Sequence, residues 1–217
     1  MLRASGIQKS YGQLPVLKNI ELEIQKAEVV AIVGASGAGK STLLHILGTL
    51  DIPDRGQVFL HNKDVFAQSS RELAAFRNRS IGFVFQFHNL LPEFTAYENA
   101  IMPGLINGKN EGEVRKRGHE LLEMLGLKDR SHHKPSELSG GEQQRTAIAR
   151  ALINNPDLIF ADEPSGNLDS KNAVELHKLF FQLRKDLQQT FVIVTHNEEL
   201  SKMADRTLEI KDGILMK

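Results

Sequence analysis

A glycine-rich segment that begins at Gly34 has the residue types and the spacing of a phosphate-binding loop. It reads Gly34, Ala35, Ser36, Gly37, Ala38, Gly39, Lys40, Ser41 and Thr42. In a G-x-x-x-x-G-K-[ST] pattern the glycines let backbone N–H groups turn toward phosphate oxygens, the lysine adds a positive charge, and the serine offers a hydroxyl to Mg²⁺. The segment therefore predicts a site for nucleotide phosphates.

Two adjacent carboxylates form a second candidate site. Asp162 and Glu163 end the apolar run 158–161, which has the composition of a buried strand. In this arrangement Asp162 would help to hold Mg²⁺, and Glu163 would face the attacking water. A surface turn at Asp162, Glu163 and Pro164 is the alternative interpretation, and the phosphate loop upstream favours the metal site over it.

The elements that must position these residues alternate between strands and helices. We expect a strand over 28–33 before the loop and a helix over 41–47 after it. Further strands are predicted at 57–60, 81–85, 158–161 and 191–194, and helices at 113–125 and 174–187. The alternation indicates an α/β core with a parallel sheet flanked by helices, in which ligands bind at the carboxyl ends of the strands.

Two regions depart from this alternation. Ile20, Leu22 and Ile24 share one face, as in a half-exposed strand, so we expect an antiparallel β region near the N-terminus. Residues from about 90 to 136 carry helical patterns and no good strand, which predicts an inserted helical subdomain. The nucleotide-binding core would then comprise 1–89 and 137–217. At 217 residues the chain fits one such domain.

Composition narrows the class of partner. Lys and Arg together number 27 and Asp and Glu also number 27, so no charge excess draws the chain to nucleic acid or to an anionic membrane surface. There is no cysteine, which excludes a disulfide framework and a thiolate metal site. The N-terminus lacks the pattern of a secretory signal, and no apolar run is long enough to span a bilayer. If the protein works at a membrane, we expect another chain to provide the span and no direct insertion into lipid.

A short motif assigns these features to a family. Residues 138–143 read Leu138, Ser139, Gly140, Gly141, Glu142 and Gln143. This run resembles the signature of the ATP-binding subunits of ABC (ATP-binding cassette) transporters, and the similarity extends from Tyr11 to the final strand. The resemblance implies a P-loop NTPase fold of the ABC type, and an ATPase that uses ATP and Mg²⁺.

The resemblance also implies roles for single residues. Tyr11 matches the aromatic residue that stacks on adenine. Gln86, which follows the strand 81–85, matches the glutamine that reaches Mg²⁺ and the water. His196 matches the histidine that contacts the γ-phosphate, and its place after the last parallel strand agrees with that role. Ser41, Gln86 and Asp162 would then be the metal ligands, with Glu163, Gln86 and His196 at the reacting group.

A second copy of the chain is implied as well. Ser139, Gly140, Gly141 and Glu142 precede an amphipathic stretch, so they would lie at the N-terminus of a helix, which attracts anions. In the family this end faces the γ-phosphate that is bound to another copy, and the homodimer closes over two ATP molecules. Asp169 matches the loop that communicates across the dimer, and Ser165 stands where threonine is more usual.

The segment from Phe87 to Pro103 should determine the partner. In the family it lines the groove that accepts a helix from a membrane subunit, so two transmembrane permease subunits are expected. Its sequence is similar to that of the subunits that drive release of lipoproteins from the bacterial inner membrane, which would place the chain at the cytoplasmic face. Macrolide-type efflux and cell-division regulation are the alternatives. DNA-repair and ribosome-acting cassettes fit poorly, because the chain has neither a long coiled-coil insertion nor a second cassette.

Overall fold

The structure is a computed structural model that describes residues 1–216. The chain forms two compact units, the first made of residues 1–77 and 181–217 and the second of residues 78–180. The boundaries fall within α2 (Ser70–Ser80) and α6 (Ser170–Leu187).

The first unit contains a four-stranded antiparallel sheet. Its strands are β1 (Leu2–Tyr11), β2 (Leu14–Ile24), β4 (Arg55–Leu60) and β5 (Lys63–Asp64), in the order β2-β1-β4-β5. On β2 the side chains of Ile20, Leu22 and Ile24 are buried, and the two glutamates between them are exposed. The predicted antiparallel region near the N-terminus is therefore confirmed.

A second, mainly parallel set of strands completes this unit. It consists of β3 (Val29–Val33), β8 (Thr190–Val194), β9 (Arg206–Lys211) and β10 (Ile214–Leu215). β3 runs parallel to both β8 and β9 and lies between them, and β10 is antiparallel to β9. β3 is followed by α1 (Lys40–Leu47), and β8 by α7 (Glu198–Met203). The glycine-rich segment is thus the connection from β3 to α1, as predicted.

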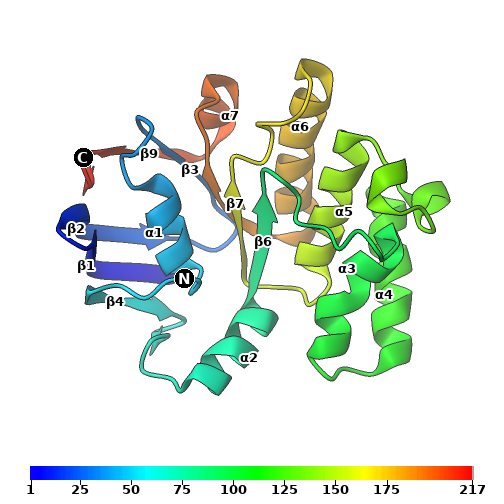
Figure 1. Ribbon diagram of the computed structural model, residues 1–217, viewed down its shortest axis with the longest axis horizontal. Coiled ribbons are helices and arrows are strands. Elements are labelled where there is room, and N and C mark those ends of the chain that lie inside the picture. The colour runs from blue at the N-terminus through cyan, green and yellow to red at the C-terminus, as the bar shows by residue number, and fades with distance from the viewer. Residues whose placement is uncertain (217) are drawn as a thin grey trace. The chain divides into compact units, whose positions relative to one another are not determined.

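The second unit has a parallel pair of strands and most of the helices. β6 (Ile81–Phe85) pairs with β7 (Leu158–Asp162), and Phe85 lies opposite Asp162. The helices are α3 (Ala96–Ile106), α4 (Glu111–Met124) and α5 (Gly140–Leu152), with short 3₁₀ turns at Lys128–Arg130 and Pro135–Glu137. Figure 1 shows α3, α4 and α5 packed side by side, and the contacts between these helices agree.

The predicted helices and strands are confirmed, with ends that shift by a few residues. The segment from about 90 to 136 contains helices and no strand, as expected. Its assignment as a subdomain of a single cassette stays a prediction. α2 was not predicted, and none of its residues is buried. Among residues 1–216, no helix has both the length and the apolar character that a membrane crossing requires.

Candidate functional site

The glycine-rich loop depends on glycine at two of its turns. Gly34 has a φ of 146°, and a Cβ at this position would lie 2.2 Å from the carbonyl oxygen of Ile210. Gly39 has a φ of 102°, and its Cβ would lie 2.8 Å from the side chain of Leu17. A larger residue would be strained in its backbone and would also collide with neighbouring atoms. The sequence therefore specifies a loop whose backbone is open to an approaching group.

The start of α1 is left without a side-chain cap. Gly39 occupies the N-cap position, and the first turn has no acidic residue. Lys40, Ser41 and Thr42 form that first turn. Backbone N–H groups and the helix dipole make such an end attractive to an anion. Lys40 folds back over the loop, where its Nζ donates to the carbonyl oxygens of residues 34 and 35 at 2.9 and 3.0 Å.

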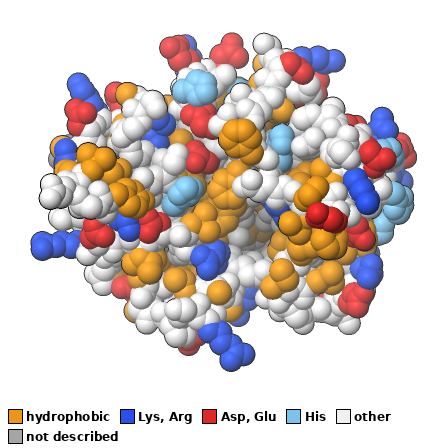
Figure 2. Space-filling view, viewed as in Figure 1, with side chains coloured by type: hydrophobic (Ala, Val, Ile, Leu, Met, Phe, Trp, Pro, Cys, Tyr) orange, Lys and Arg blue, Asp and Glu red, His pale blue; other side chains and the backbone are white. Residues whose placement is uncertain are grey.

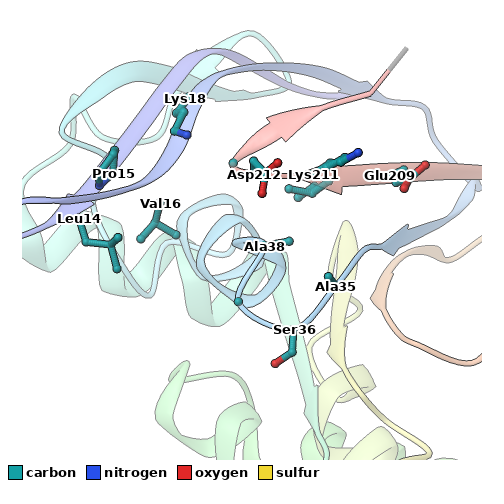
Figure 3. Close-up of a pocket in the computed structure, with 13 residues that line it drawn as sticks. Leu14, Pro15, Val16, Lys18, Ala35, Ser36, Ala38, Glu209, Lys211 and Asp212 are labelled. Carbon is teal, nitrogen blue, oxygen red and sulfur yellow. The ribbon is translucent and has the colours of Figure 1, made fainter.

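A cavity of about 510 Å³ lies beside the loop. Figure 3 shows Leu14 and Val16 of β2 on one side of it, the turn between β9 and β10 on another, and the loop residues Ala35 and Ala38 between them. Its volume is within the usual range for small-molecule sites in proteins. The phosphate loop therefore borders enough space for part of a ligand larger than a phosphate group.

Two other predicted residues belong to the first unit. Tyr11 is the last residue of β1, and its side chain is about half exposed. Its hydroxyl donates to Asp51 at 2.6 Å, and this hydrogen bond is the main reason why the pKa of Tyr11 lies above its usual 10.0. His196 follows Thr195, whose N–H donates to the carbonyl oxygen of Ile32 at 3.1 Å. This bond places the segment after β8 beside the end of β3, from which the loop starts.

The second unit brings Gln86, Asp162 and Glu163 to one edge of its strand pair. Asp162 ends β7 opposite Phe85, so Glu163 and Gln86 leave neighbouring parallel strands at the same level. Glu163 has a φ of 46°, a left-handed conformation that is unfavourable for a non-glycine residue and that occurs preferentially at functional sites. The regular strand conformation therefore ends at Asp162, and Glu163 stands at a sharp change in the backbone.

Gln86 has a partner that the sequence did not reveal. Its Nε2 donates to Oδ1 of Asn167 at 2.9 Å, and Nδ2 of Asn167 donates to the backbone carbonyl of Gln86 at 3.2 Å. The buried Gln144 of α5 donates to the carbonyl of Pro164 at 2.7 Å. These contacts join the end of β6 to the segment that follows Glu163. No local sequence pattern identifies Asn167 or Gln144 as a residue of the site. Gln144 is a polar residue on the buried face of α5, and this position is the one hint in the sequence.

The helix α5 begins as predicted. Ser139 is its N-cap, and a capping box links Ser139 and Glu142, whose carboxylate accepts from the Ser139 N–H at 2.8 Å. This hydrogen bond is the first reason why the pKa of Glu142 lies below its usual 4.5. Arg130 also pairs with Glu142 at 3.1 Å. The carboxylate of Glu142 is thus held by the protein itself, and its predicted contact with nucleotide stays a prediction.

Asp169 lies at the start of α6. Its carboxylate accepts from the backbone N–H of Asn172 at 2.9 Å and from the side-chain amide of Asn172 at 2.6 Å. These two hydrogen bonds lower the pKa of Asp169 below 3.8. Ser165 is buried, and its hydroxyl lies 3.1 Å from Nε2 of the buried His177. The loop from Ser165 to Asp169 is therefore held at both of its ends.

The predicted site residues form two groups. The first unit holds Tyr11, residues 34–42 and His196, and the second holds Gln86, Asp162, Glu163, Asp169 and the start of α5. The sequence model described as ABC transporter matches residues 17–166. The chain belongs to the ABC transporter family. This membership confirms the resemblance that was drawn from the signature motif.

Full-length relatives narrow the comparison for this ABC protein. It is 58% identical over 217 residues to "Lipoprotein-releasing system ATP-binding protein LolD" of Bacteroides thetaiotaomicron, with 100% of both chains covered. It is 57% identical to the protein of the same name from Cytophaga hutchinsonii, with 100% of this chain and 99% of the other covered. The similarity therefore spans both units.

Solved structures give the same result for the fold. The structure is similar to the dimeric bacterial ABC transporter cassette MJ0796, with a TM-score of 0.90, 41% identity, and coverage of 100% of this chain and 97% of the other. A second structure of that cassette, described as a post-hydrolysis state bound to ADP and Pi, has a TM-score of 0.91 at 40% identity and the same coverage. The predicted ABC-type fold is confirmed, and the chain is an ATP-binding cassette of the ABC ATPase family.

Proposed function

We propose that this chain is the ATP-hydrolysing subunit of a system that releases lipoproteins from the bacterial inner membrane. The observation that carries the proposal is the identity of 57–58% along the whole chain to proteins named as lipoprotein-releasing ATP-binding subunits. In this proposal it acts at the cytoplasmic face of that membrane, through partner subunits that cross the bilayer.

The first unit binds the nucleotide. Backbone N–H groups of residues 34–39 and the uncapped start of α1 receive the phosphates, and Lys40 exchanges its present carbonyl partners for phosphate oxygens. Tyr11 stacks on the base. His196, which follows β8, contacts the γ-phosphate.

The side chains proposed as metal ligands have the donor atoms that suit Mg²⁺. Ser41, Gln86 and Asp162 offer a hydroxyl, an amide oxygen and a carboxylate, which are the hard oxygen donors that this ion prefers. When bound, Mg²⁺ offsets the negative charge of the phosphates. Glu163 accepts a hydrogen bond from the attacking water and then takes its proton as the general base.

Assembly completes the site. The dipole of α5 is positive at its start, and Ser139, Gly140 and Gly141 at this end face the γ-phosphate that a second copy binds. Two copies then close head to tail over two ATP molecules, and Asp169 communicates across the dimer. ATP binding favours the closed dimer and hydrolysis releases it, because neither copy alone surrounds the γ-phosphate.

The segment 87–103 provides the contact with the permease subunits. Phe87 is 74% exposed, and Leu91 and Phe94 are also exposed, while Ala96, Ala100 and Ile101 of α3 are buried. Asn99 is fully buried and holds the loop at Leu91. Its Oδ1 accepts from the N–H of Leu91 at 2.8 Å, and its Nδ2 donates to the carbonyl of Leu91 at 3.1 Å. Figure 2 shows hydrophobic side chains gathered on the side of this unit where the loop before α3 lies.

Cross-linking in native cells tests the proposed partner. A photo-reactive residue at Phe94, or at Tyr97, is activated in cells, and the captured protein is identified by mass spectrometry. The same residue at Ile214, an exposed position in the first unit, is the control. We expect a permease that co-purifies with lipoproteins. Capture of an efflux or cell-division permease would contradict lipoprotein release and leave the ATPase assignment intact.

A further inference from the structure

The ring of Tyr11 is exposed, but its hydroxyl is fixed. Tyr11 is the last residue of β1, next to a short turn in which Gly12 has a φ of 61°. Tyr11 is 51% exposed. Few packing contacts restrain an aromatic ring at such a position. The short hydrogen bond from the hydroxyl to Oδ2 of Asp51, at 2.6 Å, supplies a restraint, and bonds from a phenol to an ionised carboxylate are among the stronger ones.

Asp51 is itself held in place. Its Oδ1 accepts from Nζ of Lys9 at 2.8 Å and from the N–H of Ile52 at 2.7 Å. Lys9 is mostly buried and also donates to the carbonyl of Ile52 at 2.7 Å. Burial raises the pKa of Asp51, but the hydrogen bonds from Lys9 and Tyr11 more than offset it, and the pKa lies below 3.8. The acceptor for Tyr11 is therefore ionised and immobile at neutral pH.

The same contacts connect Tyr11 to the helix that starts at the phosphate loop. The N–H groups of Leu50 and Asp51 donate to the carbonyl of His45 in the last turn of α1, at 2.8 and 3.2 Å. Lys9 adds a cation–π contact, with Nζ 5.3 Å from the ring centroid. Asp51, which accepts the hydroxyl of Tyr11, is thus connected through its backbone to the last turn of α1.

We propose that Asp51, oriented by Lys9, is a positioning residue that fixes the ring of Tyr11 for stacking on the base of the nucleotide. The inference rests on the proposed function, in which Tyr11 contacts the base and residues 34–42 bind the phosphates. A ring that is already held in its bound orientation loses less conformational freedom when the ligand arrives. The benefit falls on affinity, because the base is remote from the transferred phosphoryl group.

A double-mutant cycle tests this role. ATP affinity is measured by calorimetry, and KM and kcat by ATP hydrolysis, for Tyr11→Phe, Asp51→Ala and the double variant. Each single change should raise the Kd and KM for ATP about three- to ten-fold, the effect of one hydrogen bond, and leave kcat unchanged. The double variant should be no weaker than either single variant, because both remove the same bond.

Two further variants and one probe separate positioning from a general structural role. Asp51→Asn keeps a hydrogen-bond acceptor and should recover part of the affinity. Glu23→Gln alters an exposed carboxylate of β2 that accepts from Gln25 at 3.0 Å, outside the contacts of Lys9, Asp51 and Tyr11, and should have no effect. Inorganic triphosphate, which has no base, should bind every variant as tightly as the original chain.

The outcomes are distinguishable. Two results would overturn the inference and would show that Asp51 supports α1 instead. One is a rise in the Kd for ATP in the double variant that equals the product of the two single fold-changes. The other is an equal loss of triphosphate and ATP binding in Asp51→Ala. Unchanged ATP affinity in both single variants would also overturn it, with the ATPase assignment intact. If the original chain bound neither ATP nor triphosphate, the proposed function itself would fail.

Discussion

The guanidinium of Arg150 holds the segment that follows Gln86. From the last turn of α5, Nη1 donates to the carbonyl of Asn89 at 2.5 Å and Nη2 donates to the carbonyl of His88 at 2.7 Å. His88 and Asn89 have φ values of 60° and 50°, so two consecutive non-glycine residues are in the left-handed region. We predict that Arg150→Met will release this segment and lower the stability of the chain.

The magnitude follows from two opposing terms. A left-handed conformation costs roughly 1–2 kcal/mol for each ordinary residue, and less for asparagine. A hydrogen bond from a charged donor contributes about 1.5–3 kcal/mol, so the two bonds of Arg150 offset the backbone cost. Methionine keeps most of the aliphatic stem and removes both donors. Because the segment can relax after the change, we expect the free energy of unfolding to fall by about 2–4 kcal/mol.

Urea denaturation followed by circular dichroism measures this difference. Arg145→Met is the matched control, since it lies on the same helix and its side chain donates no hydrogen bond to another part of residues 1–216. Arg150→Lys, which cannot form the two-pronged contact, should lose about half as much stability as Arg150→Met. If the free energies of unfolding of Arg150→Met and Arg145→Met agreed within about 0.5 kcal/mol, the reasoning would be refuted.

Three further changes have expected outcomes. Gly34→Ala should abolish ATP binding in calorimetry and lower the melting temperature, because the new methyl group meets the carbonyl of Ile210; normal binding would contradict this. Gly118→Ala should cost about 1–3 kcal/mol in urea denaturation, since its Cβ would lie 2.3 Å from a methyl group of α3, and an unchanged midpoint would contradict it. The pKa of Glu142 is lowered chiefly by the hydrogen bond from the N–H of Ser139, so the unfolded chain binds the proton more readily than the folded chain. The free energy of unfolding should therefore fall as the pH drops below 4.5. Glu142→Gln should flatten this dependence in urea titrations between about pH 3 and pH 6.

Local patterns predicted the elements that bury an apolar face. β6 and β7 were predicted because residues 81–85 and 158–161 are almost entirely apolar, and the pair is buried in the second unit. The start of α5 was predicted because Ser139 and the residues after it have the composition of a helix N-terminus, and the capping box is present. α2, in which no residue is buried, was not predicted.

Contacts between distant residues could not be predicted. Asp51 follows Tyr11 by 40 positions, and Asn167 follows Gln86 by 81. No motif links the members of either pair, because each contact arises only when separate elements fold together. The phosphate loop and the signature were recognisable because their chemistry requires consecutive backbone groups, whose spacing is fixed along the chain.

The most direct test of the central claim is the mass of Glu163→Gln in solution with saturating ATP and Mg²⁺, measured by size-exclusion chromatography with light scattering. Glutamine keeps the shape of the side chain but cannot accept a proton from the attacking water, so ATP should stay bound without hydrolysis. Lys40→Ala, which weakens phosphate binding, is the control and should stay monomeric. We expect Glu163→Gln to form a dimer that retains ATP. A monomer under these conditions would contradict the account of an ATPase completed by its second copy.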